Sequence, residues 1–295
     1  MTLPNLLLAG APRCGTTSLF ETMRDYEEIF IPEDKELWFF FNDELWQKGV
    51  EWYESRFSGY SGQKVVAEAT PLYFCCPECL ERIAATLPDV RLMLSFRNPI
   101  DRALSHYWLN VRKSKESLPL EQAFESDVRG ERAWKIEKGA LNYFGIGRYD
   151  EHLARIRDIF GPDRTHVIIF EELVADPGKV LADASGFMGL SGPLGESLRK
   201  SNRSQWLKSR RHGALYSDFP AKRLASGLLP EPLRKVVRGL RDKAAFGKDR
   251  PEPDERLIVE MAEYFSDSLV KLESMLGKSL DSWRSHHAFR RVLGE

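Results

Sequence analysis

Residues 10–18, GAPRCGTTS, combine the residue types that hold a phosphate group. Gly10 and Gly15 permit a tight turn and a close approach of the backbone to a ligand. Arg13 adds a positive charge, and hydroxyl-bearing residues open a predicted helix whose N-terminus favours an anion. We expect this turn to bind an anion through Arg13, Cys14, Gly15, Thr16, Thr17 and Ser18.

The turn has the outline of the loop G-x-x-x-x-G-K-[ST], but Thr16 stands at the lysine position. In that motif the lysine neutralises the terminal phosphates of a nucleoside triphosphate. An ordinary glycine-rich turn is the alternative, yet a basic residue and two threonines between strand and helix favour an anion site. The missing lysine predicts a ligand other than ATP.

A second candidate anion site lies in SFRNPIDRALSHY, residues 95–107. Arg97 ends an apolar run, where burial of an unpaired guanidinium is costly, so it requires an anionic partner. That partner is either a ligand or a structural carboxylate, and the sequence leaves both open. Ser105 follows in the next predicted helix, whereas we expect Arg102 to pair with carboxylates at the surface.

Apolar runs alternate with segments of helical periodicity, which predicts an α/β fold. The predicted strands are 5–10, 64–70, 90–96 and 165–173. The predicted helices are 16–24, 76–87, 99–112, 148–160, 179–188 and 254–276. We expect a P-loop-type, mostly parallel central sheet flanked by helices, with a helical C-terminal portion and no strand after residue 190.

No linker divides the chain, so we expect a single domain over residues 1–295, with a sheet core at about 4–190 and a loop and helices at about 191–295. In a parallel sheet, ligands bind where strands end and helices begin. The two anion sites therefore suit one nucleotide with phosphates at two separate positions. ATP carries its phosphates in one chain and would leave the second site without a ligand.

The overall charge gives no reason to expect nucleic acid or an anionic membrane as a partner. Lys and Arg number 43 and Asp and Glu 44, for a formal net charge of 43 − 44 = −1. The chain enters an apolar strand directly after MTLPN, and no run approaches the ~18 apolar residues of a membrane span. We expect a cytoplasmic protein with no membrane span.

The four cysteines are too few and too clustered for a disulfide framework. Cys76 and Cys79 form one C-x-x-C, but zinc takes four ligands and the sequence has no second pair. We expect Cys75, Cys76 and Cys79 to be buried or half-buried thiols at a helix start.

The two turns together resemble those of the sulfotransferases that use PAPS, 3′-phosphoadenosine 5′-phosphosulfate. AGAPRCGTTSL is similar to the family loop that binds the 5′-phosphosulfate, and FRNPIDRALSHY to the family segment that binds the 3′-phosphate. In that family an Arg and a Ser hold the 3′-phosphate, and Arg97 and Ser105 match them. The resemblance implies PAPS as cosubstrate, PAP as the released product and no metal. It extends from residue 6 to about residue 190.

Two further segments resemble the heparan-type and other carbohydrate sulfotransferases. DKELWFF, residues 34–40, is similar to a family segment whose Glu is the proposed catalytic base, which implies Glu36 as the base and Lys35 as its neighbour. EATPLYF, residues 68–74, is similar to E-K-[ST]-P-x-Y. The chain departs from the family at Arg13 and Ala69, where lysine is usual.

The segment RKSNRSQWLKSRR, residues 199–211, has six basic residues and no acidic one. Its position resembles a family loop that closes over the nucleotide, which implies contacts of Lys208, Arg210 or Arg211 with the 3′-phosphate. A solvated basic loop or a polyanion contact is the alternative.

These features predict transfer of the sulfuryl group from PAPS to a hydroxyl or amine of a carbohydrate or small-molecule acceptor. Arg13 and Lys35 would assist at the sulfuryl group, and Lys35 alternatively tunes Glu36. A P-loop kinase or NTPase is one alternative, because VVAE and VIIFEE are apolar runs ending in acids. A non-catalytic nucleotide-binding module is another. The sequence identifies neither the acceptor nor the oligomeric state.

Overall fold

A computed structural model describes residues 2–113, 115–131, 141–199, 206–207, 246–247 and 253–294. The centre of the fold is a five-stranded sheet in the order β2-β3-β1-β4-β5, in which every neighbouring pair is parallel. The strands are β2 (Ile29–Phe30), β3 (Val65–Glu68), β1 (Leu6–Gly10), β4 (Arg91–Phe96) and β5 (Thr165–Ile169). The predicted α/β class with a parallel central sheet is confirmed.

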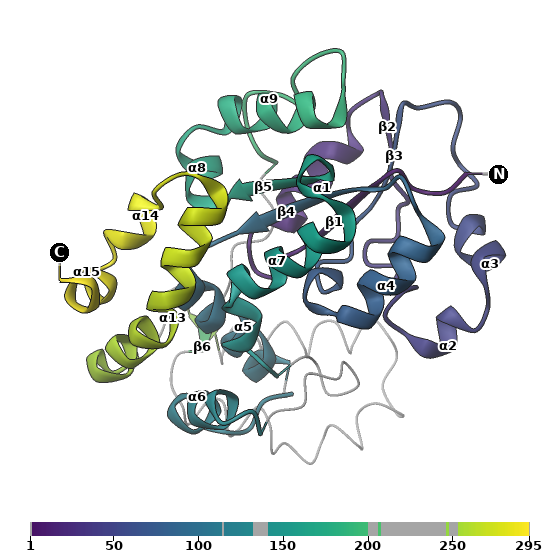
Figure 1. Cartoon of the computed structure of the whole chain (residues 1–295). Helices are drawn as coiled ribbons and strands as arrows, with labels where there is room; N and C mark the ends of the chain where they lie inside the picture. The colour runs from purple at the N-terminus through teal and green to yellow at the C-terminus, as the bar shows by residue number, and fades with distance from the viewer. Residues whose placement is uncertain are drawn as a thin grey trace.

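Helices cover both faces of the sheet, so the strands have no solvent-facing side (Figure 1). On one face lie α1 (Thr16–Arg24), α8 (Phe170–Ala175) and α9 (Pro177–Met188). On the other lie α3 (Val50–Ser55), α4 (Pro77–Thr86), α5 (Pro99–Arg112), α6 (Leu120–Val128), α7 (Tyr149–Phe160), α13 (Glu255–Leu276), α14 (Asp281–Arg284) and α15 (His287–Leu293). The short helix α2 (Asp43–Trp46) precedes α3, and the 3-10 helices are η1 (Tyr73–Cys75), η3 (Gly145–Gly147) and η4 (Pro162–Arg164).

The sequence of β1, LLLAG, is apolar throughout because the strand is central and buried on both faces. Its neighbours are β3 and β4, with Leu6 opposite Ala67 on one side and Arg91 on the other. The turns that follow β1 and β4 therefore lie side by side at the carboxyl edge of the sheet. This adjacency confirms the expectation that the two candidate anion sites are neighbours.

Two predictions about strands are wrong, and one strand was not predicted. The predicted strand 165–173 ends at Ile169, and α8 begins at Phe170, where Glu171 and Glu172 occupy the first turn and favour a helix N-terminus. Strands are present after residue 190, since β6 (Trp206–Leu207) pairs antiparallel with β7 (Phe246–Gly247). The edge strand β2 was missed because two residues carry no detectable periodicity.

The prediction of thiols at Cys76 and Cys79 is also wrong, because these two residues form a disulfide. Cys76 precedes the first residue of α4, and the first helical turn brings the two Cα atoms to 5.1 Å, within the range that a disulfide spans. Cys75 is a buried free thiol, as expected. Among the described residues no helix is long and apolar enough to cross a membrane.

Candidate active site at the carboxyl edge of the sheet

The turn between β1 and α1 is built from close backbone contacts. A Cβ atom at Gly10 would lie 2.5 Å from the ring of Phe74, so only glycine fits there. Gly15 has φ +81°, a left-handed conformation that glycine adopts without strain, and a Cβ on it would lie 2.7 Å from the ring of Phe170. Both glycines serve the tight turn that the sequence predicted.

The start of α1 offers unneutralised backbone donors. Gly15 precedes the helix without a side-chain cap, and the first turn contains no acidic residue. The first N–H groups of a helix have no intrahelical acceptor, so this end of α1 favours an anion. Thr16 is buried and Thr17 exposed, so only the second hydroxyl faces solvent.

The thiol of Cys14 is buried beneath the turn, not directed to solvent. Its Sγ lies 3.7 Å from the hydroxyl of Tyr149, and burial raises the pKa of the thiol to about 11. Cys14 is therefore neutral at pH 7. It contributes its backbone to the turn rather than a thiolate.

The second turn begins with Arg97, directly after β4. Its guanidinium lies 5.3 Å from the ring centroid of Phe170 and 3.8 Å from Asp101, and the side chain keeps 25% of its surface exposed. Asn98 caps α5 by accepting from the backbone N–H of Ile100 at 3.0 Å. Arg97 thus has a distant carboxylate partner and remains open to a ligand.

Buried hydrogen bonds tie the two turns together. Ser95 in β4 accepts from the backbone N–H of Ala11 through its carbonyl at 2.8 Å, and its Oγ donates to the carbonyl of Cys14 at 2.7 Å. The Tyr149 hydroxyl, which contacts Cys14, donates to the carbonyl of Arg97 at 3.0 Å.

One side-chain bond connects the turns more directly. Nε of Arg13 donates to Oγ of Ser105 at 3.0 Å, and Ser105 is 5% exposed. Arg13 has φ +73°, a left-handed backbone conformation that is uncommon for an L-residue, and this conformation sets the direction of its side chain. The structure therefore brings together two residues that the sequence assigned to opposite ends of one ligand.

Arg13 is surrounded by positive charge. Burial, followed by the neighbouring guanidinium groups of Arg112 and Arg97, lowers the pKa of Arg13 to about 10. Arg13 nevertheless stays protonated at pH 7. A bound anion would stabilise this cluster of guanidinium groups, because its negative charge compensates for the desolvation of Arg13 and for the repulsion among the groups.

The segment between β2 and α2 carries Lys35 and Glu36 to the first turn. Nζ of Lys35 donates to Oγ1 of Thr17 at 2.7 Å and lies 3.7 Å from the carboxylate of Glu36. The side chains of Lys35 and Glu36 are 20% and 35% exposed, and burial lowers the pKa of Lys35. The structure thus places Lys35 and Glu36, two of the three predicted catalytic residues, beside the turn between β1 and α1.

The prediction for Arg102 is wrong. The side chain is fully buried, and it donates to the carbonyl of Tyr143 and contacts Nδ1 of His106 at 3.4 Å. The helical periodicity of α5 directs this position toward the core, a direction that the charged residue type concealed. His106 is also buried, and its pKa is held well below its usual range by burial.

Sequence reasoning missed Tyr149, Phe170 and Arg112 as parts of the site. Tyr149 and Phe170 lie outside both motifs and contact the turns only through the fold. Lys208, Arg210 and Arg211 lie outside the described residues, so their predicted contacts stay predictions. The neighbouring strand β6 lies beside α5, the helix that carries Ser105.

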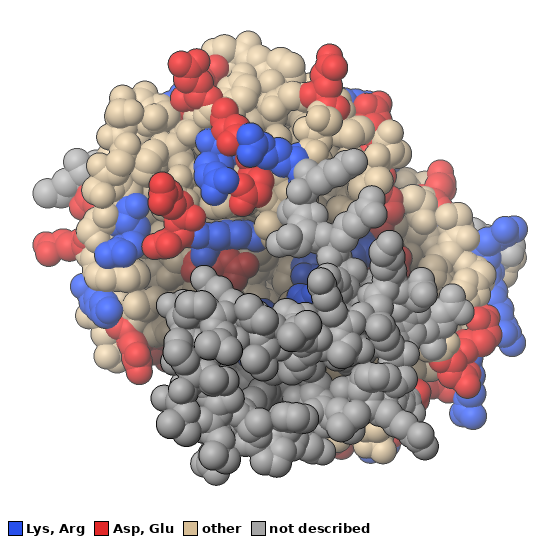
Figure 2. Space-filling model, turned by 180° about the vertical axis from the view of Figure 1, so that it is seen from behind, with Lys and Arg blue, Asp and Glu red and all other residues tan. Residues whose placement is uncertain are grey.

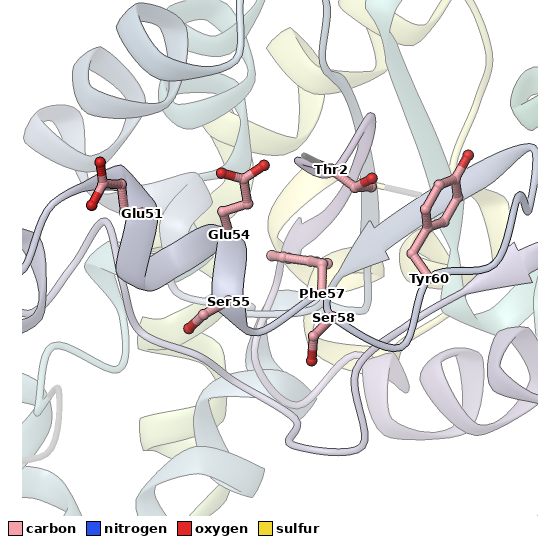
Figure 3. A pocket seen from close by; sticks show the side chains of 7 residues that line it. All are labelled: Thr2, Glu51, Glu54, Ser55, Phe57, Ser58 and Tyr60. Carbon is pink, nitrogen blue, oxygen red and sulfur yellow. The ribbon is translucent and has the colours of Figure 1, made fainter.

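A separate hollow of about 550 Å³ opens beside α3 (Figure 3). The hollow is lined by Thr2, Glu51, Glu54, Ser55, Phe57, Ser58 and Tyr60, and it contains none of the predicted site residues.

On the face shown in Figure 2, basic and acidic side chains are interspersed over the described residues. Attraction of an anion therefore depends on local placement, as at Arg13. The described residues contain no group of three or more His, Cys, Asp or Glu side chains suited to a metal ion.

Comparison with known proteins identifies the family. A model of the sulfotransferase domain matches residues 3–211, which include both turns and the segment of Glu36. The chain belongs to the sulfotransferase family. The resemblance drawn from the two motifs is confirmed at this level.

Among sulfotransferases, the chain is 34% identical over 134 residues to the membrane-associated sulfotransferase kil1 of Dictyostelium discoideum, over 44% of this chain and 28% of that protein. It is 23% identical over 290 residues to the human heparan sulfate glucosamine 3-O-sulfotransferase 5, over 95% of this chain and 74% of that protein. The predicted likeness to heparan-type sulfotransferases is thus confirmed.

Among solved structures, a sulfotransferase from Alicyclobacillus acidocaldarius superposes with a TM-score of 0.68 at 24% identity. The superposition covers 96% of this chain and 100% of that one. This likeness supports the fold described above.

Proposed function

We propose that the protein transfers the sulfuryl group of PAPS to a hydroxyl or amine of a carbohydrate acceptor and releases PAP. The observation that carries the proposal is the bond between Arg13 and Ser105, which connects the two candidate anion-binding turns. A nucleotide with phosphates at both its 3′ and 5′ positions uses both turns. Membership in the sulfotransferase family supports this choice of donor.

The first turn is proposed to hold the 5′-phosphosulfate. The N-terminal amides of α1, the hydroxyl of Thr17 and the guanidinium of Arg13 are its donors. Arg97 and Ser105 are proposed to hold the 3′-phosphate. The positive charge around Arg13 fits a ligand with several negative charges, since each phosphate relieves the repulsion among the guanidinium groups.

In the proposed reaction, the acceptor oxygen or nitrogen forms a bond to sulfur while the bond between sulfur and the 5′-phosphate oxygen breaks. The electron pair of the broken bond leaves with PAP, and the acceptor proton passes to Glu36. Lys35 and Arg13 stabilise the charge that develops around sulfur and the leaving oxygen. Lys35 is suited to this task because its ammonium lies between Thr17 of the loop and Glu36.

The proposed acceptor class rests on the relatives that match most of the chain, whose names state that they sulfate a glucosamine of heparan sulfate. This chain has Ala69 in place of the lysine usual in that group, and Ala69 is 1% exposed. No cation therefore reaches the acceptor from position 69. We propose an acceptor that requires less positive charge at that point than heparan sulfate does.

A thermal shift experiment tests the donor. PAP should raise the melting temperature of the protein, and ATP with Mg²⁺ should raise it much less, because ATP has no phosphate to bind Arg97 and Ser105. Stabilisation by ATP with Mg²⁺ and not by PAP would support a kinase or NTPase instead. Binding of PAP without transfer to any acceptor in a broad carbohydrate panel would support a non-catalytic nucleotide-binding module.

A further inference from the structure

Glu68, the last residue of β3, is a buried carboxylate next to the candidate base. It is 1% exposed, and no Lys or Arg pairs with it among the described residues. Instead, hydroxyl groups donate to it: Tyr53 at 2.6 Å to one oxygen and Thr70 at 2.5 Å to the other. A buried acid with this many donors has a structural or functional task, because its burial is costly.

Two backbone N–H groups of the segment that carries Glu36 bind to residues 69 and 70. The N–H of Glu36 donates to the carbonyl of Ala69 at 3.1 Å. The N–H of Trp38 is directed to Oγ1 of Thr70 at 3.5 Å. Thr70 therefore stands between Trp38 and Glu68 and links the two.

These contacts hold a backbone that is unfavourable on its own. Glu36 has φ +65° and Trp38 φ +58°, which are left-handed conformations. Such a conformation costs roughly 1–2 kcal/mol for a residue with a side chain. Glu68 supports this turn through Thr70, whose hydroxyl donates to the carboxylate and accepts from the N–H of Trp38.

We propose that Glu68 is a positioning residue: its buried carboxylate, with Thr70, holds the left-handed turn at residues 36–38 and so fixes Glu36 and Lys35 beside the first anion-binding turn. The inference rests on the proposed role of Glu36 in proton transfer. Glu68 does not touch the reacting atoms, because its side chain is enclosed by Tyr53, Thr70 and the turn itself.

Two substitutions on the turn side test this role. Glu68→Gln replaces one acceptor oxygen by an amide that donates, and Thr70→Val removes the hydroxyl that links Trp38 to Glu68. Each should lower kcat for release of PAP from PAPS, with water as the acceptor, by about tenfold to a hundredfold, since small displacements of a catalytic group have effects of this size. The dissociation constant for PAP should stay within about twofold, because the nucleotide turns are unchanged.

Two matched variants separate positioning from stability. Tyr53→Phe removes the hydrogen bond to Oε2 of Glu68, the oxygen that Thr70 does not contact, and keeps the ring that stacks on Phe39. It should therefore lower the melting temperature and leave kcat per folded molecule unchanged. Thr70→Ser keeps the hydroxyl and should restore kcat. Wild-type kcat in Glu68→Gln and Thr70→Val, or an equal fall of kcat in Tyr53→Phe, would overturn the proposal.

A measurement independent of activity distinguishes this inference from the proposed function. Hydrogen exchange of the N–H groups of residues 36–38 should accelerate at least tenfold in Glu68→Gln or Thr70→Val and much less in Tyr53→Phe. Unchanged exchange in both turn-side variants would overturn the inference even if the enzyme transfers sulfuryl groups. Failure of the wild-type protein to bind PAP would instead overturn the proposed donor, and the exchange result would still decide whether Glu68 holds the turn.

Discussion

Nε of Arg13 donates to Oγ of Ser105 at 3.0 Å, across 92 residues of sequence. Arg13 belongs to the turn after β1 and Ser105 to α5, so the bond fixes the two turns relative to each other. A lysine has one terminal nitrogen, whereas arginine reaches Ser105 with Nε and has two further nitrogens for other contacts. The arginine at position 13 therefore has a function in this chain that charge alone does not describe.

Replacing Ser105 by Ala tests the hydrogen bond that connects the two turns. The change removes the acceptor of the Arg13 Nε–H group and one proposed donor to the 3′-phosphate. We expect the dissociation constant for PAP to rise about tenfold or more, because a hydrogen bond of a charged group contributes about 1.5–3 kcal/mol. Calorimetric titration measures the change. Ser117→Ala, in the exposed segment after α5, is the control, and equal affinity of both variants would contradict the assignment.

Replacing Glu36 by Gln tests the proposed base. The amide keeps the size of the side chain but accepts no proton, so kcat should fall by about 10²–10⁴. The affinity for PAP should be nearly unchanged, because Glu36 contacts Lys35 and not the second turn. Steady-state kinetics and PAP titration together check the prediction. A lost affinity with a parallel loss of folding would mean that Glu36 is structural.

Replacing Trp283 by Phe tests whether the C-terminal helices support the nucleotide site. Oε2 of Glu171 accepts from Nε1 of Trp283 at 2.7 Å, while Oε1 accepts from the backbone N–H of Asn98 at 3.0 Å. The variant should lose about 1–3 kcal/mol of stability and bind PAP several-fold more weakly, because Glu171 loses one of its two donors.

A matched substitution is available for the Trp283 experiment. Trp108→Phe removes an indole N–H that has no acceptor among the described residues, so no hydrogen bond is lost. Thermal unfolding and PAP titration of both variants give the comparison. Equal behaviour of the two would show that the bond to Glu171 is unimportant.

The half-buried histidine His152 should make the protein sensitive to acid. Burial lowers the pKa of His152 from its ordinary value of 6.5 to about 4, and its Nε2 lies 3.1 Å from the carbonyl of Gly145. Between these two values the unfolded chain binds a proton that the folded protein does not, so stability falls as pH decreases from about 6.5 to about 4. The loss due to this group is at most about 3 kcal/mol.

Denaturant unfolding across that pH range measures the effect. His152→Gln keeps a donor for Gly145 and does not titrate, so its free energy of unfolding should fall less steeply with decreasing pH than that of the wild-type protein. Parallel pH curves for the two proteins would contradict the prediction. His166, whose pKa burial also lowers, remains in both proteins and contributes equally.

The sequence predicted the parts of the site that depend on local spacing. Gly15 between strand and helix and Arg97 at a strand end are positions where the chemistry of one residue type fits one local conformation. The adjacency of the two turns also followed, because parallel strands place their carboxyl ends together.

The contacts between distant residues could not be predicted in the same way. Arg102 points into the core because of its position on the surface of α5, whereas its charged side chain suggests a position at the protein surface. The bond of Tyr149 to the carbonyl of Arg97 depends on where α7 packs, which no local pattern encodes. The disulfide of Cys76 and Cys79 depends on the exact start of α4, the least predictable property of a helix.

The two hydrogen bonds of Glu171 have a consequence for the order in which the site forms during synthesis. Glu171 is separated by 73 residues from Asn98 and by 112 residues from Trp283. The β1–α1 turn takes its buried side-chain contacts from Ser95, Ser105 and Tyr149, all of which are made before α8. The support of the second turn must wait until α14 has been made and has docked. A nascent chain should therefore form the β1–α1 half of its nucleotide site long before the half that contains Arg97. Tight nucleotide binding would mark the docking of the last helices onto a sheet that is already assembled.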